Sequence, residues 1–299
     1  MVISLILLIL VNAAVMASLY LIFYLLQFHF GVDIVGNYPG DYRYMFIYAM
    51  AIGFLGSFVS LLLSKTIAKR SVGAVRIDPA KPRNDFELWL VKTVQRHAEA
   101  AGIKMPEVYW YDGPANAFAT GWRKNGAMVA VSTGLAQTLG PEEISGVLAH
   151  EIGHIKNGDM VRMALLQGVL NTFVIFFSFL IASALTGGRK NDRAERELQW
   201  LISLVAQIVL TFFATLILMW YSRRREFRAD ARAVELDGAE GIYNALAALG
   251  SLPGKKALPG GLKAFGIVGF FGLLSSHPPI EKRLRHIEKV AERLSRKKR

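Results

Sequence analysis

Four long apolar blocks constrain this chain more than any other feature of its sequence. They cover residues 2–30, 44–63, 163–185 and 198–221, within a chain that is 53% hydrophobic. Each reaches the roughly 20 residues that an α-helix needs to cross a bilayer. Core helices of a large soluble protein are the alternative, but the length of the blocks and their lack of charge disfavour it. The sequence therefore predicts four transmembrane helices and a multi-pass membrane protein.

The second pair of blocks admits another interpretation. Gln167 and Asn171 interrupt the third block, and Gln199 and Gln207 interrupt the fourth. Two such helices could pack into a hairpin that dips into the membrane without crossing it. The sequence leaves open whether these two blocks span the bilayer fully.

Basic residues beside the blocks predict which side each loop faces, because positively charged loops stay cytoplasmic. They gather after the second and fourth blocks, as Lys65, Lys69, Arg70, Arg76, Arg223, Arg224, Arg225 and Arg228. We therefore expect the N-terminus, the middle segment and the C-terminal third to face the cytoplasm, at the plasma membrane. The loop after the third block disagrees, since its own basic residues should resist export: Arg189, Lys190, Arg193 and Arg196.

The net charge of +12 raises the question of a nucleic-acid partner. Much of this charge lies at the edges of the apolar blocks and in the tail at 281–299. Attraction to anionic lipid headgroups explains that placement more simply, although a solvated helix end explains the tail equally well. We therefore expect a lipid bilayer, and no nucleic acid, as partner. The absence of cysteine excludes disulfides, thiolate metal ligands and a cysteine nucleophile.

The two polar segments that follow the apolar pairs are expected to fold together. In the first, Asn84 or Asp85 caps a helix that stops at Gly102. Pro141 opens a further helix in the same segment. Short strands are expected at 107–111, 116–120 and 128–132. In the second segment, helices are expected at 224–236, at 241–249 and from 281 onward.

The helix that Pro141 opens carries the pattern H-E-x-x-H at residues 150–154. Residues four apart on a helix lie only about 40° apart around its axis, so His150 and His154 face the same way. Two neutral imidazoles at this spacing can bind one Zn²⁺, and Glu151 then lies where it can take a proton from the attacking water. Only three positions of the pattern are fixed, so ordinary helix residues could match it by chance.

A catalytic zinc requires a third protein ligand, which must come from elsewhere in the chain. The candidates are the remaining histidines and the acids of the last segment: His29, His97, His277, His286, Glu226, Asp230, Glu235 and Asp237. Glu226 and Asp230 are the most suggestive, because they share one face of a helix expected to start directly after the fourth block. One could bind zinc while the other orients a histidine, or both could pair with neighbouring arginines. Spacing alone does not decide between these interpretations.

Five segments carry a resemblance to a known family, in the order in which that family has them. They are residues 116–119, 132–135, 150–154, 226–230 and 276–279, the last followed by Arg283. By these segments, and by the placement of its four apolar blocks, the chain resembles the membrane-bound zinc metallopeptidases of the HtpX type. The CAAX prenyl proteases are more distant relatives of that family. The likeness covers nearly the whole chain.

The resemblance implies one Zn²⁺ per chain, with His150, His154 and Glu226 as its ligands. Glu151 would be the general base, and later the acid that protonates the leaving amine.

Four further roles follow from the same resemblance. Asp230 would steady a ligating histidine, Arg283 would hold the electrostatics of the site, and His277 would donate to the oxyanion. An edge strand of four residues would bind an extended peptide through main-chain hydrogen bonds: Asn116, Ala117, Phe118 and Ala119.

Several of these residues also have simpler interpretations. Asn116 could be a turn residue, His277 a helix-entry residue and Arg283 a lipid contact. We expect Asp159 to be a cap or turn residue without a role in the site. His97, on an amphipathic helix, is expected to be structural.

Other classes of protein compete with this reading. An intramembrane metalloprotease would take a ligand from an Asp in an L-D-G setting, which Leu236–Gly238 provides. However, Lys156, Asn157 and Asp159 follow the H-E-x-x-H pattern, whereas an intramembrane site needs an apolar bundle around it. A prenyl-directed endopeptidase, a metal transporter and a non-catalytic zinc-binding membrane scaffold remain as further alternatives.

The sequence thus predicts an α+β, mainly helical fold, with a zincin-like metalloprotease domain attached to four transmembrane helices. Residues 1–64 and 163–222 are expected to form two transmembrane hairpins, and 65–162 and 223–299 the two parts of the catalytic domain. The expected substrates, implied by the resemblance, are misfolded or damaged membrane proteins cleaved on the cytoplasmic side. The Gly-rich apolar run at 266–274 could cover the cleft or touch lipid.

Overall fold

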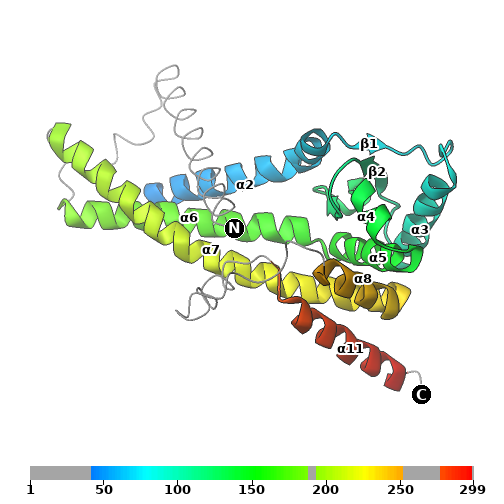
Figure 1. The fold of residues 1–299 in the computed structure, drawn as a ribbon. Coiled ribbons are helices and arrows are strands. Elements are labelled where there is room, and N and C mark those ends of the chain that lie inside the picture. Colours follow the sequence, from blue (N-terminus) through cyan, green and yellow to red (C-terminus); the bar gives the residue numbers. More distant parts are fainter. Residues whose placement is uncertain (1–41, 188–192, 252–276, 298–299) are drawn as a thin grey trace. The chain divides into compact units, whose positions relative to one another are not determined.

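The computed structural model describes residues 42–187, 193–251 and 277–297 of the 299-residue chain (Figure 1). The first apolar block, His29 and the run at 266–274 lie outside these residues. The chain divides into two compact units, which are described separately below. Unit 1 comprises Met1–Ser60 and Ala164–Thr215, and unit 2 comprises Leu61–Met163 and Leu216–Arg299.

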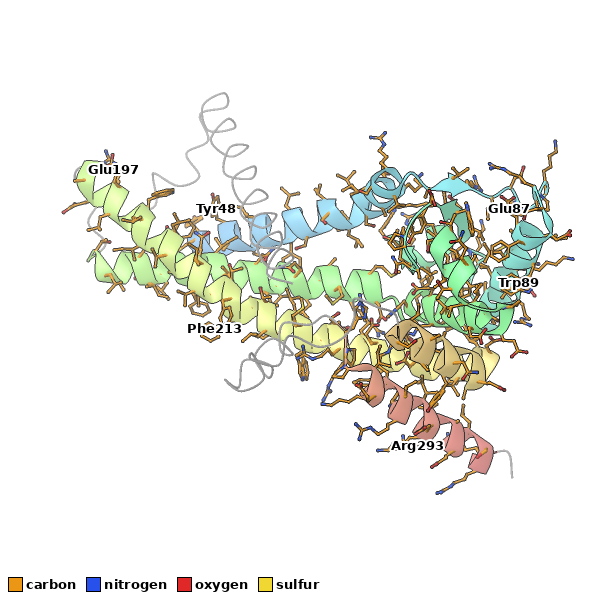
Figure 2. The ribbon with its side chains drawn as sticks, in the orientation of Figure 1. Tyr48, Glu87, Trp89, Glu197, Phe213 and Arg293 are labelled. Atoms are coloured by element: carbon orange, nitrogen blue, oxygen red, sulfur yellow. The ribbon has the colours of Figure 1, made fainter. Side chains whose placement is uncertain are left out.

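Three helices in the described residues are long and apolar enough to cross a membrane: α2 (Tyr42–Val72), α6 (Asp159–Leu185) and α7 (Arg193–Asp237). They match the second, third and fourth apolar blocks. Large apolar side chains stand exposed along them, as Phe213 does on α7 (Figure 2). Such surfaces suit lipid better than water, so these three predicted helices are confirmed as candidate membrane spans.

Small residues bring α2 and α6 together within unit 1. A Cβ atom added to Gly53 would lie 2.6 Å from the backbone nitrogen of Thr172, and one added to Gly168 would lie 2.8 Å from the ring of Phe54. Glycine at both positions therefore permits a close approach of the two helices, as is common between membrane helices.

The prediction of a separate helix at 224–236 is wrong, because α7 continues without a break from Arg193 to Asp237. The basic residues at 223–225 suggested a boundary, but arginine is a good helix former. Neither glycine nor proline occurs between Arg193 and Asp237, and α7 ends only where Gly238 adopts a φ of 84°. The fourth block and the acids that follow it therefore share one continuous helix.

The helix termini of unit 2 follow the predicted capping residues. In α3 (Asp85–Ala101), the Asn84 side chain accepts a hydrogen bond from the backbone of Glu87, and Gly102 closes the helix at a φ of 63°. Helix α5 (Pro141–Asn157) begins at Pro141, as expected. The predicted helices near 241–249 and after Pro279 are confirmed as α8 (Glu240–Ser251) and α11 (Ile280–Lys297).

A four-stranded sheet in the order β1-β2-β4-β3 completes unit 2. Strands β2 (Glu107–Tyr111) and β4 (Met128–Ser132) run parallel and have their predicted bounds, whereas β3 (Ala117–Thr120) pairs with β4 antiparallel and forms one edge. The two-residue β1 (Val75–Arg76) and the short helices η1 (Lys124–Gly126) and α4 (Thr133–Thr138) were not expected.

The main core of unit 2 lies between α3, α5 and the sheet. It includes Leu90 and Val94 of α3, Leu148 and Ile152 of α5, and Val129 of β4. Apolar packing therefore fixes which face of α5 points into this core. The polar residues of the H-E-x-x-H pattern, His150, Glu151 and His154, are not part of the core.

We predict that Gly146→Ala destabilises unit 2, because α5 and α8 meet there in close contact. A Cβ atom at position 146 would lie 2.3 Å from the backbone nitrogen of Ile242. Such overpacking costs about 1–3 kcal/mol. Thermal unfolding of the detergent-solubilised protein measures the loss. Gly126→Ala is the control, since its Cβ would meet only Arg123 at 3.9 Å. Equal melting temperatures for the two variants would contradict the prediction.

Candidate metal centre

The two histidines of the H-E-x-x-H pattern lie one turn apart on α5 and face α7, within unit 2. Gly153, between them, lets the helices approach closely: a Cβ atom there would lie 3.0 Å from Cβ of Arg232 and 3.2 Å from the carbonyl oxygen of Ala229. The closeness of α5 and α7 at this point brings Glu226 and Asp230 to the imidazole rings.

Three donor atoms converge between α5 and α7. Nε2 of His150 lies 3.1 Å from Nε2 of His154. Oε2 of Glu226 lies 3.7 Å from the His150 nitrogen, and Oε1 of Glu226 lies 3.4 Å from the His154 nitrogen. All three side chains are buried, and Glu226 is only 1% exposed. In the part of the chain that the structure describes, these residues form the one cluster of His, Asp and Glu able to hold a metal ion.

The donor set fits a tetrahedral zinc site. Zinc bonds of about 2.0–2.1 Å, in tetrahedral geometry, separate neighbouring donor atoms by about 3.3 Å. The two imidazole nitrogens lie 3.1 Å apart, and each lies 3.4 Å or 3.7 Å from a different oxygen of the Glu226 carboxylate, which is close to this value. Two imidazoles and one carboxylate are also a donor combination that zinc accepts in catalytic sites.

Each histidine is held through its second ring nitrogen by a buried carboxylate. Nδ1 of His150 lies 2.9 Å from Oδ1 of Asp230, and Nδ1 of His154 lies 2.7 Å from Oδ2 of Asp159. Both acids are fully buried. Such pairs fix the tautomer and direct the Nε2 lone pair towards the centre.

Asp159 corrects our expectation that it is only a cap or turn residue. It does begin α6, directly after Gly158, whose φ of 68° ends α5. That turn carries the chain back, so that the Asp159 carboxylate reaches the last histidine of the pattern. The sequence did contain a signal for this contact. Asp159 lies five residues after the candidate ligand His154, and it directly follows Gly158, a glycine that ends the helix.

Arg283, from α11, joins the centre to the last helix. Its guanidinium binds the carboxylate of Asp230 through two hydrogen bonds, 2.9 Å and 2.5 Å long. The same group lies 3.6 Å from Glu226 and 3.4 Å from Nδ1 of His150. Arg283 therefore contacts Glu226, which is a candidate metal ligand, and Asp230, which holds the His150 ring.

Two further residues of the sequence prediction lie beside the cluster. His277 is 62% exposed, and its Nδ1 lies 2.8 Å from Oε2 of Glu226. Glu151 is half-buried, and its charge is close enough to raise the pKa values of His154 and Arg283.

Contacts with charged neighbours outweigh burial at this centre. Burial alone would lower the pKa of His154, but hydrogen bonds to Asp159 and Glu226 raise it to about 9. Burial would raise the pKa of Asp230, but the Arg283 guanidinium lowers it. Burial would also lower the pKa of Arg283, but Asp230 raises it. Asp230 and Glu226 both lie beyond the apolar stretch of α7, which ends at residue 221.

The predicted peptide-binding strand begins one residue later than expected. Ala117, Phe118 and Ala119 lie in β3, which α5 packs against, and β3 pairs with β4 on one side only. Asn116 precedes the strand, and its backbone exchanges hydrogen bonds of 2.9 Å and 3.0 Å with Ser132. The outer edge of β3 is therefore the edge of the described sheet.

The other candidate ligands have different contacts. His97 is buried and bonds to the Ser145 hydroxyl, which confirms a structural role. Asp237 accepts hydrogen bonds from Ser145 and Arg96, so the L-D-G aspartate belongs to this separate cluster. His286 bonds to the backbone of α7, and Glu235 pairs with Arg232.

An H-E-x-x-H helix completed by a buried glutamate, in a chain with long apolar helices, defines a membrane metallopeptidase. Comparison with known proteins gives the family. The model of peptidase family M48 matches residues 85–291, and the chain belongs to this family.

The relatives agree with this assignment. Protease HtpX of Xanthomonas euvesicatoria pv. vesicatoria is 49% identical over 263 residues, which cover 85% of this chain and 89% of the relative. Protease HtpX of Stenotrophomonas maltophilia is 48% identical over 260 residues, with the same coverage. The crystal structure of S. mikatae Ste24p has a TM-score of 0.63 and 18% identity, covering 91% of this chain and 66% of that one. Its likeness supports the mainly helical α+β fold.

We predict that Arg283→Met destabilises the metal-free protein by about 3–5 kcal/mol, because it leaves the carboxylate of Asp230 buried without its cation. Adding Asp230→Asn should restore part of this loss, since no buried charge then lacks a partner. Chemical denaturation of the four proteins of this cycle, in chelator, measures the coupling. Strictly additive effects of the two substitutions would contradict the prediction.

Proposed function

We propose that this protein is a zinc-dependent endopeptidase that binds one Zn²⁺ through His150, His154 and Glu226. The convergence of three buried donor atoms at distances suited to a tetrahedral ion carries this proposal. Membership of peptidase family M48 supports the reaction class. A catalytic site also needs an open coordination position, which three protein ligands leave available.

The side chains around the cluster suit peptide hydrolysis. Zinc, when bound, supplies a Lewis acid that polarises the peptide carbonyl and lowers the pKa of water to about 7. Glu151, next to His150 but outside the donor cluster, would take the proton of the attacking water and later deliver it to the leaving amine. Asp230 and Asp159 would keep the two imidazoles oriented.

His277 and Arg283 would act on the charge that develops during the reaction. The His277 side chain is exposed, so a bound peptide can reach it, and its ring could donate a hydrogen bond to the oxyanion. Arg283 is buried against both Asp230 and Glu226. We assign it an electrostatic and positioning role, not direct contact with the substrate.

The substrate is proposed to be an extended segment of polypeptide. The outer edge of β3 offers main-chain groups for an added strand, which would include Ala117, Phe118 and Ala119, with Asn116 at its start. Main-chain pairing accepts many side chains, as proteolysis of varied misfolded chains requires.

The position of Glu226 on α7 favours membrane proteins as substrates. Glu226 lies five residues beyond the apolar stretch that ends at Tyr221, or about 7 Å along the helix axis. Three of the four residues in this interval are arginines, which favours the cytoplasmic side of the plasma membrane. We propose that the enzyme cleaves damaged or misassembled membrane proteins there, as a quality-control protease.

The metal ligands are tested by metal analysis. His150→Ala and Glu226→Ala should each lower zinc affinity by at least about 100-fold, because a three-ligand site loses one donor. Inductively coupled plasma mass spectrometry of the purified full-length proteins measures retained metal. Glu235→Ala is the control. Glu235 lies on α7 like Glu226, but its side chain is exposed, so this variant should keep its zinc. Full zinc content in Glu226→Ala would mean that the third ligand lies elsewhere.

The general base is tested by a change that keeps the shape of the side chain. Glu151→Gln should retain zinc and lower hydrolysis of a misfolded membrane protein by about 100- to 10,000-fold. Glu142→Gln, in the exposed first turn of α5, should leave the rate unchanged. A chelator should abolish wild-type cleavage.

Each outcome separates the alternatives. Full activity of Glu151→Gln would refute its role, and cleavage that survives the chelator would refute metal catalysis. Zinc binding without cleavage of any polypeptide would favour a non-catalytic scaffold.

A further inference from the structure

A basic groove lies between α7 and α11, on unit 2. It has a volume of about 800 Å³ and is lined by Trp220, Tyr221, Arg224, Phe227, Arg228, Lys282, Arg285, His286 and Lys289. Five of these nine residues are cationic, three are aromatic and none is acidic. The lining therefore favours an anionic ligand with an apolar part.

The α7 wall of the groove starts where the apolar stretch of this helix ends. Trp220 and Tyr221 are its last residues, and Arg224 and Arg228 follow one and two turns later. The Arg224 guanidinium lies over the Trp220 ring, 4.6 Å from its centroid. Arg228 donates a hydrogen bond of 3.2 Å to the Tyr221 hydroxyl. Aromatic residues at the end of an apolar helix anchor it at the membrane interface.

Distance along α7 places Arg224 at headgroup depth and Arg228 just beyond it. Arg224 lies three residues past Tyr221, which corresponds to about 4.5 Å along the helix, and Arg228 about 10 Å. The headgroup layer on each side of a bilayer is about 5–7 Å thick. Lipid phosphates therefore come within reach of both guanidinium groups.

The α11 wall adds a stripe of cations on one helix face. The cations Lys282, Arg285 and Lys289, together with the His286 ring, follow the spacing i, i+3, i+4 and i+7, so they point the same way. Across residues 42–187, 193–251 and 277–297, the cations Lys282, Arg285 and Lys289 form no ion pair, and neither does Arg224. No carboxylate of the described residues lies within ion-pair distance of these four cations.

Two contacts fix the groove between the helices. The His286 ring bonds to the backbone carbonyl of Phe227 at 3.0 Å, and Arg283, on the inner face of α11, binds Asp230 of α7. The spacing of the two basic walls is therefore set by the folded unit and does not depend on a ligand.

From these observations we propose that the α7–α11 groove binds the phosphate headgroup of an anionic phospholipid. Its cations match the phosphate, its aromatic residues match the start of the acyl chains, and its depth matches the headgroup layer. A nucleic acid would share the phosphate chemistry, but the groove opens at the end of an apolar helix, where lipid is present at high local concentration. This proposal does not rest on the proposed proteolytic chemistry, although Arg228 borders both the groove and Asp159.

The test uses the full-length protein in neutral detergent and native mass spectrometry to count bound lipids. Phosphatidylglycerol and phosphatidylcholine with identical acyl chains are titrated separately. We expect Arg285→Gln/Lys289→Gln to weaken phosphatidylglycerol binding by about 30-fold, which corresponds to about 2 kcal/mol for two cations near a lipid phosphate. Each single substitution should have an intermediate effect. Arg228 is left unchanged, because it lies 3.7 Å from Asp159 at the metal centre.

The matched control removes two positive charges elsewhere in unit 2. Lys92→Gln/Lys104→Gln changes two exposed lysines on and after α3 and should leave binding unchanged. Circular dichroism checks that every variant is folded. Equal affinity of wild type and Arg285→Gln/Lys289→Gln, or equal binding of both lipids, overturns the proposal. Binding of inorganic phosphate or a short oligonucleotide that depends on Arg285 and Lys289, without lipid binding, overturns the lipid assignment.

Discussion

The buried carboxylates between α5, α7 and α11 set the constraint on which the rest of unit 2 depends. Glu226, Asp230 and Asp159 are all buried, and an isolated buried carboxylate is far too costly to persist. Their compensation comes from Arg283 and from the two imidazoles of α5. Burial would lower the pKa of His154, but its contacts with Asp159 and Glu226 raise it to about 9. The polar centre is thus stable only as a set, which ties together α5, the start of α6, α7 and α11.

Rigid elements, not loops, hold this set in place. His150 and His154 are one turn apart on α5, Glu226 and Asp230 are one turn apart on α7, and Gly153 lets the two helices approach until these pairs meet. A site on helices keeps its geometry better than a site on loops. The apolar packing of α5 on the sheet fixes the rotation of that helix. The orientation of the histidines therefore follows from the core beneath them.

Local chemistry explains what could be predicted from the sequence. Asn84, Gly102 and Pro141 each have one strong conformational preference, and the helices end or begin at these residues. Turn residues with similarly strong preferences flank β2 and β4, and these two strands could therefore be predicted as well. In contrast, the two residues of β1 carry no pattern, and the change from apolar to basic residues at 223–225 does not end α7, because arginine continues a helix.

The centre itself required contacts that no local pattern contains. Spacing placed Glu226 and Asp230 on one helix face but did not say which of them meets the imidazole Nε2 atoms, because that depends on the depth at which α7 crosses α5. Asp159 looked like a helix-start residue, and it is one, yet the turn at Gly158 also carries it to His154. Asp159 has two roles, since it starts a helix and it also contacts a ligand histidine. Its preference for a helix start reveals only the first of these roles.

Helix α7 also relates the site to the lipid layer by a fixed length. Tyr221 ends the apolar stretch, Glu226 faces the imidazoles, and Arg228 lies between the basic groove and Asp159, all within seven residues or about 10 Å of helix. A continuous helix cannot change these separations without losing backbone hydrogen bonds. The separation between the end of the apolar stretch and the Glu226 carboxylate is therefore a fixed property of α7.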